Sequence, residues 1–347
     1  MSEQQKSLLK QAEDSSGQYG GFSFGGQEPF GVKPYNQMKA GTIFPNGAKA
    51  AILLTFDVEG NYGNGTGNQK KEIVNYKRIC SKLSSYNIPA TFNVVGKMAE
   101  KHGLEFIGWM FDAGCEVAPH GYWHDLDRVF EERKVYAGHY GYDENLSQIR
   151  LGVVAINKFK QDSVKGIRLP YAHFNEYSYQ VMEELGLEWA SHVGIDDFVV
   201  PGQGFGGMPF QMRLGDKKYD IVEIPLDSQT YDWSIWVADE KTNKTFVDAV
   251  YAYCQSRSVK FERIPKGAVE IWRQRIVDAI SNQTVFTLLC HPINLTVESD
   301  KWNDAVDEFL FPVIEYIGQL AKENKIWVCT CNELADFYKQ EIKQIGE

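Results

Sequence analysis

The stretch LLTFDVEGNYG, residues 53–63, decides how the rest of the chain is interpreted. An apolar run ends there in two carboxylates, Asp57 and Glu59, which are one residue apart. Such a run is typical of a buried strand, and binding or catalytic groups are concentrated on the loops that follow such strands. The sequence therefore predicts a strand that carries chemical groups at its carboxyl end.

Similar apolar runs alternate with amphipathic helical patterns from residue 48 onward. The expected strands cover residues 50–56, 90–96, 115–121, 166–171, 187–193, 219–226, 284–291 and 326–331. Near-continuous apolar strands that alternate with helices predict a parallel sheet covered on both sides. Seven or eight such units favour an α/β fold of the distorted (β/α)7-8 barrel type over a doubly wound sheet. No GxGxxG dinucleotide motif follows the first strand.

The charge and composition narrow the range of partners. The 347 residues include 36 Lys and Arg against 46 Asp and Glu, a net charge of −10, with no basic run to bind a phosphate backbone. We therefore expect no nucleic-acid partner. We find neither a signal pattern nor an apolar run of membrane-spanning length, so a cytoplasmic location without a membrane partner is expected. The six cysteines lack disulfide or zinc-finger spacing and are expected to be buried free thiols.

Two segments are expected. Residues 1–46 are rich in Gly, Gln, Ser and aromatic residues and follow neither the helical nor the strand period, which predicts an irregular arm. Residues 47–347 would form the barrel. A purely solvated linker would not normally carry this much aromatic area, so the arm should pack over the domain or over a partner subunit, and a homo-oligomer is favoured.

Polar residues recur at the predicted carboxyl ends of the strands. Active sites of barrel enzymes lie at this end, so residues far apart in the sequence should converge there. The candidates, from the first, third, fourth, sixth and seventh predicted strand ends, are Asp57 and Glu59, His120 and His124, Arg168, Asp232, and His291.

The histidine pair suggests a metal site. His120 and His124 are four residues apart. This spacing often occurs by chance, so it indicates a metal site only if a third ligand is found. Glu59 is the candidate third ligand. Three protein ligands with one open position are typical of catalytic zinc. Asp57 would then act as general base toward a water on the metal. Alternatively, Asp57 caps the next segment or pairs with Arg168, and the second of these contacts could coexist with catalysis.

Five motifs then carry a family resemblance. In chain order they are TFDVEG, HGYWH, RLPYA, DSQTYDW and LLCHP, and they resemble the motifs of the polysaccharide deacetylase family, carbohydrate esterase family four, over roughly residues 48–335. The resemblance implies hydrolysis of a carbon–nitrogen amide bond, typically of an N-acetyl group, on a distorted barrel with a divalent metal, for which Zn²⁺ is the first expectation.

The resemblance also implies a role for each matching residue. Asp57 resembles the base, and Glu59, His120 and His124 resemble the metal ligands. His291 resembles the acid that protonates the leaving amine. The supporting roles are orientation of the base by Arg168, steadying of Arg168 by Asp232, an oxyanion donor near Tyr171, and an acyl-methyl pocket of Leu288 and Leu289.

Two further substrate contacts are suggested by position alone. His173 directly follows the RLPYA motif at the rim. Trp233, Trp236 and Trp272 could form a sugar platform, although core packing is the simpler explanation for such residues.

Departures from the family pattern leave alternatives open. The usual first motif, Thr-Phe-Asp-Asp-Gly, is replaced by Asp-Val-Glu-Gly, which inserts one residue and lengthens the metal carboxylate. Such features resemble an intracellular branch that includes peptidoglycan deacetylase-like proteins and metal-independent allantoinases. Asp196 and Asp197 compete with Asp232 for the fourth-motif role. The substrate could therefore be an amino-sugar amide or a small cyclic amide or ureide, and a catalytically inactive barrel that binds a glycan or a partner is the third alternative.

Overall fold

A computed structural model describes residues 32–63, 67–124, 127–130, 133–136, 140–193, 207–227 and 230–345. Within these ranges the strands are β1 (Val32–Tyr35), β2 (Ala50–Val58), β3 (Thr91–Val94), β4 (Glu116–Pro119), β5 (Asp127–Phe130), β6 (Arg133–Tyr136), β7 (Gly166–Ile167), β8 (Trp189–Ala190), β9 (Phe210–Leu214), β10 (Lys217–Glu223), β11 (Val285–Cys290) and β12 (Ile326–Val328).

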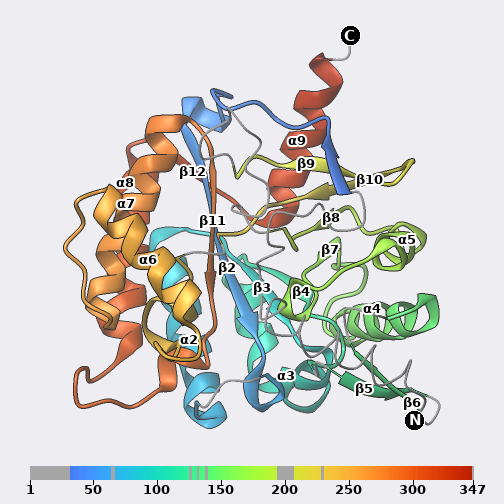
Figure 1. Cartoon of the computed structure of the whole chain (residues 1–347), viewed down its shortest axis with the longest axis horizontal. Helices are drawn as coiled ribbons and strands as arrows, with labels where there is room; N and C mark the ends of the chain where they lie inside the picture. The colour runs from blue at the N-terminus through green and yellow to red at the C-terminus, as the bar shows by residue number, and fades with distance from the viewer. Residues whose placement is uncertain are drawn as a thin grey trace.

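The parallel strands form two sheets that together make a distorted barrel (Figure 1). One sheet has the order β11-β2-β3-β4, with β12 pairing with the first residues of β2. The other has the order β1-β9-β10-β8-β7, in which β10, β8 and β7 are parallel and β9 and β1 are antiparallel. Single backbone bonds link the sheets: Arg168 N–H donates to Pro119 O at 3.3 Å, and Asp227 N–H donates to Thr287 O at 3.1 Å. Within the described ranges no strand ladder closes the ring. The predicted distorted barrel is confirmed.

Helices cover the outside of this barrel, except for α9 (Cys331–Ile345), which packs against its inner face. The outer helices are α2 (Gln69–Tyr86), α3 (Gly96–Asp112), α4 (Tyr142–Asn157), α5 (Glu176–Glu184), α6 (Lys244–Ser256), α7 (Pro265–Asn282) and α8 (Phe311–Lys322). Figure 1 shows α7 and α8 on one side of the strands and α4 and α5 on the other. Local signals start two of them, since Asn68 caps α2 by accepting a bond from Lys71 N–H, and Asn175 forms a capping box with Ser178 at the start of α5.

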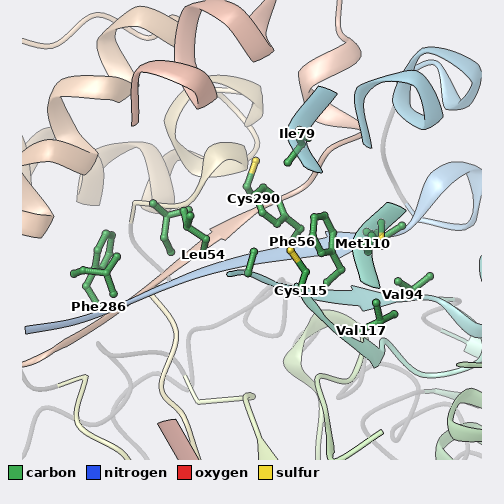
Figure 2. Packing of buried hydrophobic residues seen from close by; sticks show 14 of the residues in the cluster. Leu54, Phe56, Ile79, Val94, Met110, Cys115, Val117, Phe286 and Cys290 are labelled. Carbon is green, nitrogen blue, oxygen red and sulfur yellow. The ribbon is translucent and has the colours of Figure 1, made fainter. Parts of the chain in front are cut away.

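The alternation of side chains along β2 divides the core into two parts. Ile52, Leu54 and Phe56 point outward and pack under the helices (Figure 2). Ala51 and Leu53 point inward and join a second cluster with Leu334, Ala335 and Tyr338 of α9. Helix α9 therefore fills the barrel interior at the amino ends of the strands. The inward positions that follow on β2 are Thr55 and Asp57, so the polar site lies toward the opposite end of the barrel.

Several elements were not expected from the sequence. The prediction of an irregular arm over residues 1–46 is wrong for Val32–Tyr35, because these residues form β1 against β9; residues 1–31 lie outside the described ranges. Helices α6 and α9 and the β5-β6 hairpin were also missed. The last expected strand ends early, since Cys331 begins α9. The prediction of buried free thiols is confirmed for all six cysteines.

Candidate active site

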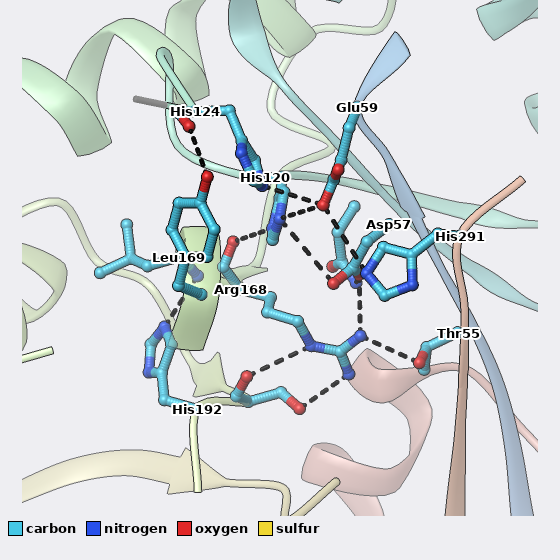
Figure 3. Close-up of polar contacts among 12 residues, drawn as sticks. Thr55, Asp57, Glu59, His120, His124, Arg168, Leu169, His192 and His291 are labelled. Carbon is cyan, nitrogen blue, oxygen red and sulfur yellow. Dashed lines mark hydrogen bonds and ion pairs between the residues drawn. The ribbon is translucent and has the colours of Figure 1, made fainter. Parts of the chain in front are cut away.

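The carboxyl ends of β2, β3 and β7 bring the base candidate and its partners together (Figure 3). Asp57 lies directly opposite Asn93 in the ladder between β2 and β3. Its Oδ1 accepts bonds from Asn93 Nδ2 and from Arg168 Nη1, both at 2.9 Å. Its Oδ2 lies 3.8 Å from His120 Nε2. One carboxylate oxygen is thus engaged by donors, while the other faces the histidine pair.

Electrostatics keep Asp57 in its basic form. Burial alone would raise the pKa of this carboxyl, but the Arg168 guanidinium, the imidazoles of His120 and His291 and the Asn93 hydrogen bond together outweigh that effect and hold the pKa below its ordinary value. The side chain is therefore ionised at neutral pH and can accept a proton.

Glu59, His120 and His124 meet immediately beside Asp57. Glu59 Oε1 lies 2.9 Å from His124 Nε2 and 3.7 Å from His120 Nε2. The three candidate ligand atoms lie within 4.8 Å of one another, and all three residues are buried. His120 Nδ1 is 2.8 Å from Arg168 O, so Nδ1–H donates and the Nε2 lone pair is left facing Glu59.

The donor set fits a divalent cation. His124 is 4% exposed, and among the described residues neither of its ring nitrogens has a partner in hydrogen-bond geometry. Buried polar groups normally have partners. Two imidazoles and one carboxylate that converge in this way are the ligands of catalytic zinc sites, and an imidazole whose second nitrogen is bound to a carbonyl is typical of a metal-ligating histidine.

Arg168 links several strands beneath Asp57. In addition to the Asp57 contact, Nη1 donates to Thr55 Oγ1 at 3.0 Å, Nη2 donates to Ser191 Oγ at 2.9 Å, and Nε donates to Ser191 O at 3.2 Å. The side chain is 1% exposed. A buried guanidinium held on three sides has a fixed position, and it fixes the Asp57 carboxylate in turn.

Asp232 pairs with His291 and not with Arg168. Its Oδ1 lies 2.9 Å from His291 Nδ1, and its Oδ2 accepts bonds from His291 N–H at 3.1 Å and from Asn294 Nδ2 at 2.8 Å. The expectation that Asp232 steadies Arg168 is therefore wrong: the loop after β10 directs this carboxylate to the end of β11. The competing residues Asp196 and Asp197 lie outside the described ranges.

The Asp232 carboxylate sets the charge of His291. Burial would lower the pKa of the imidazole, but Asp232, together with Glu59 and Asp57, outweighs burial and raises the pKa to about 10. His291 Nε2 faces the candidate metal ligands, 3.6 Å from Glu59 Oε1. A protonated imidazole in this position can donate a proton across the site.

A small apolar group lies next to His291. Leu289 packs with Leu226 and Tyr231, and Trp233 packs against them. The ring of Tyr231 is centred 5.9 Å from His291. Leu288 was expected to share this pocket, which is wrong, because adjacent strand residues face opposite sides and Leu288 lies under the outer helices.

The two other tryptophans of the candidate sugar platform, Trp236 and Trp272, belong to the core. Trp236 and Trp272 both make edge contacts with Phe309 and are buried, at 8% and 0% exposure. Core packing is thus confirmed for these two residues, and of the three platform candidates Trp233 alone stays close to the site.

The RLPYA motif forms a strained turn at the rim. Tyr171 and Ala172 have φ of +56° and +53°, which is costly for residues other than glycine. The Tyr171 hydroxyl donates to His124 O at 3.2 Å, and its ring is centred 4.6 Å from the His124 ring. The His173 ring is centred 5.9 Å from Tyr171. Tyr171 therefore lies beside a candidate metal ligand, and His173 lies next to Tyr171.

A buried histidine supports this turn from below. His192 Nε2 accepts a bond from Leu169 N–H at 3.0 Å, and the imidazole stacks on Phe174. Glu223 accepts bonds from the N–H groups of His192 and Val193. The bond from Leu169 satisfies Nε2, whereas Nδ1 has no hydrogen-bond partner among the described residues.

We expect His192 to make the fold sensitive to acid. Burial and the charge of Arg168 lower the pKa of His192 to about 3, below the unfolded value, so only the unfolded chain takes up its proton in the range between them. This contribution to stability is fully present above about pH 6.5 and is lost as the pH falls toward 3, with about 2 kcal/mol gone by pH 5. Urea unfolding at pH 7 and pH 5 measures this loss. His192→Gln keeps an acceptor for Leu169 without a titrating group, and an equal loss in both proteins would contradict the prediction.

Sequence reasoning missed several of these supporting residues. Thr55, Asn93 and Ser191 hold Asp57 and Arg168, and Asn294 holds Asp232. The available signal was a polar residue within an apolar strand, as Asn93 is in TFNVV and Thr55 is in LLTF.

Comparisons with known proteins agree with the fold and the motifs. Residues 45–190 match the family model described as polysaccharide deacetylase, which confirms the resemblance carried by the motifs. The class that this family defines is the hydrolases of carbon–nitrogen bonds other than peptide bonds. A bifunctional xylanase/deacetylase of Pseudobutyrivibrio xylanivorans is 25% identical over 174 residues, covering 45% of this chain. The chain spans only 26% of the length of that relative.

Solved structures share the overall fold. A candidate polysaccharide deacetylase from Mycobacterium smegmatis superposes with a TM-score of 0.64 at 19% identity, covering 89% of this chain and 96% of that one. A PuuE allantoinase superposes with a TM-score of 0.53 at 13% identity, covering 91% and 95%. At these identities the likeness concerns the fold alone. None of the helices in the described ranges has the length and apolar character needed to cross a membrane.

Proposed function

We propose that this protein is a metal-dependent amide hydrolase that removes an acyl group from an amino-sugar or related substrate. The observation that carries the proposal is the convergence of Glu59, His120 and His124 within 4.8 Å, with Asp57 and His291 beside them. A module that only binds has no use for both a proton acceptor and a spaced proton donor.

Glu59, His120 and His124 would hold the divalent ion, for which we propose Zn²⁺ on the basis of the ligand types. Zinc polarises a carbonyl and lowers the pKa of a bound water to near 7. The buried, hydrogen-bonded position of His120 supports this assignment, as do the buried ring nitrogens of His124, which have no partner in hydrogen-bond geometry among the described residues.

The protein side chains supply the proton transfers. Asp57 accepts a proton from the attacking water while Arg168 holds its other oxygen. The hydroxyl adds to the carbonyl carbon, the carbon–nitrogen bond breaks, and His291 gives its proton to the departing nitrogen. Asp232 keeps His291 charged and oriented until that step.

Substrate contacts follow from the neighbours of these groups. The backbone N–H of Tyr171 is our candidate for the oxyanion donor, since a strained turn presents it beside His124. Leu289, with Tyr231 and Trp233, would receive the acyl methyl, and His173 would contact the remainder of the substrate.

Turnover assays with acetylated amino sugars and with cyclic ureides or imides test the proposal. We expect release of acetate that a chelator abolishes and zinc restores. Turnover of cyclic amides alone, unaffected by the chelator, would favour a metal-independent ureide hydrolase. Glycan binding without turnover of either class would favour an inactive binding barrel.

Other expectations from the sequence stay predictions. Size-exclusion chromatography with light scattering would test the homo-oligomer, and cell fractionation would test the cytoplasmic location. A boundary between an arm and the barrel, with β1 (Val32–Tyr35) now counted with the barrel, can be tested by limited proteolysis.

A further inference from the structure

The short segment from His120 to His124 carries two of the three metal-ligand candidates, and it lies after the end of β4 without regular secondary structure. Its position therefore depends on contacts from other elements. His120 N–H donates to Val94 O at 2.8 Å. The carbonyls of Gly121 and Tyr122 accept bonds from Gly96 N–H at 2.9 Å and Lys97 N–H at 3.0 Å, at the start of α3.

A single side chain holds the middle of this segment from the other direction. Gln148, on α4, accepts bonds at Oε1 from Tyr122 N–H at 3.2 Å and Trp123 N–H at 3.0 Å. Its Nε2 donates to Trp123 O at 2.6 Å. Gln148 is 4% exposed, and these three bonds all go to the two residues that precede His124.

The fit between α4 and the segment is close. Gly121 has φ of +63°, and a Cβ there would lie 2.7 Å from Gln148 Nε2 and 3.0 Å from Pro170 Cδ. A Cβ on Gly152, one turn further along α4, would lie 2.9 Å from Gly121 O. Helix α4 therefore packs directly against the backbone between the two histidines.

We propose that Gln148 is a positioning residue that sets the separation and orientation of His120 and His124 for metal binding. This inference rests on the proposed metal site. The amide is suited to the task because it has both an acceptor and a donor, and here the acceptor meets two N–H groups while the donor meets a carbonyl. Without it, three part-buried backbone groups of the segment lose the bonds that Gln148 makes, and the His124 ring can move more relative to His120.

The test is the zinc affinity of the apo protein, measured by competition with a chromophoric chelator. We expect Gln148→Ala to weaken zinc binding by roughly tenfold or more, within the range known for residues that support metal ligands. Gln148→Glu keeps the acceptor and loses the donor, so its affinity should lie between those of Gln148→Ala and the wild type.

Asn145 offers a matched control on the same helix. Its buried amide donates to Tyr140 O, Gly141 O and Asn175 Oδ1 at 3.0, 2.9 and 3.3 Å, away from the histidine segment. Asn145→Ala should lower the melting temperature and leave zinc affinity unchanged.

The outcomes separate the two proposals. If the wild type binds no zinc, the proposed metal site fails. If the wild type binds zinc and Gln148→Ala binds it equally well, or if Asn145→Ala weakens binding as much, the positioning role of Gln148 is overturned while the metal site stands. Should Gln148→Ala not fold, Gln148→Glu decides by the same comparison.

Discussion

Replacing His120 with alanine is expected to abolish zinc binding and amide turnover together. His120 is the most constrained of the three ligand candidates, because Arg168 O fixes its Nδ1 and its Nε2 faces both Glu59 and Asp57. Alanine leaves two ligands, so the loss in metal affinity should exceed the roughly hundredfold limit found for supporting residues. Metal analysis of the purified variant and an acetate-release assay measure the two losses.

A histidine outside the site provides the control for this variant. His102 lies on α3 and contacts Glu105 at the surface, so His102→Ala should retain zinc and turnover. If His120→Ala lost its zinc but hydrolysed its substrate at the wild-type rate, the metal would have no catalytic part and the metal-independent alternative would be favoured.

The second large effect is expected for Asp57→Asn, which should retain zinc and lose turnover. Asparagine is nearly the same size but cannot accept the proton, so kcat should fall by about 10² to 10⁴. The variant should also be less stable, because Arg168 is left buried without its counter-charge, a change that costs about 3–5 kcal/mol in comparable pairs. Steady-state kinetics, metal content and urea unfolding give the three quantities separately.

Asp220 provides a surface comparison on β10, where its Oδ1 accepts a bond from Gln211. Asp220→Asn should change neither kcat nor stability appreciably. A wild-type kcat in Asp57→Asn would show that Asp57 is not the general base and would favour the structural alternative, in which it only pairs with Arg168.

Much of the scaffold could be predicted because its signal is local. The apolar runs that end in Asp57, His120 and His291 coincide with β2, β4 and β11, and the carboxyl ends of parallel strands necessarily lie at one end of a barrel. The sequence alone therefore predicts that the motif residues lie close together.

The remaining features depend on contacts between distant parts of the chain. The strand β1 forms by pairing with β9, which lies almost two hundred residues further along the chain, so its own residues carry no local signal for it. The partner of Asp232 depends on the path of the loop that carries it, which sequence spacing does not fix. Leu288 and Leu289 are equally apolar, and only the register of β11 against β2 decides which one faces the site.

The filling of the barrel interior by α9 affects how the chain can reach this structure during synthesis. Ala51 and Leu53 leave the ribosome long before Leu334 and Tyr338, their eventual neighbours in the inner cluster. Until those residues emerge, the nascent barrel exposes an apolar cavity at one end, where chaperones or other chains can bind. The fold is therefore completed late in synthesis. A small truncation of α9 should lower the yield of folded protein in cells and leave the turnover of the protein that does fold unchanged.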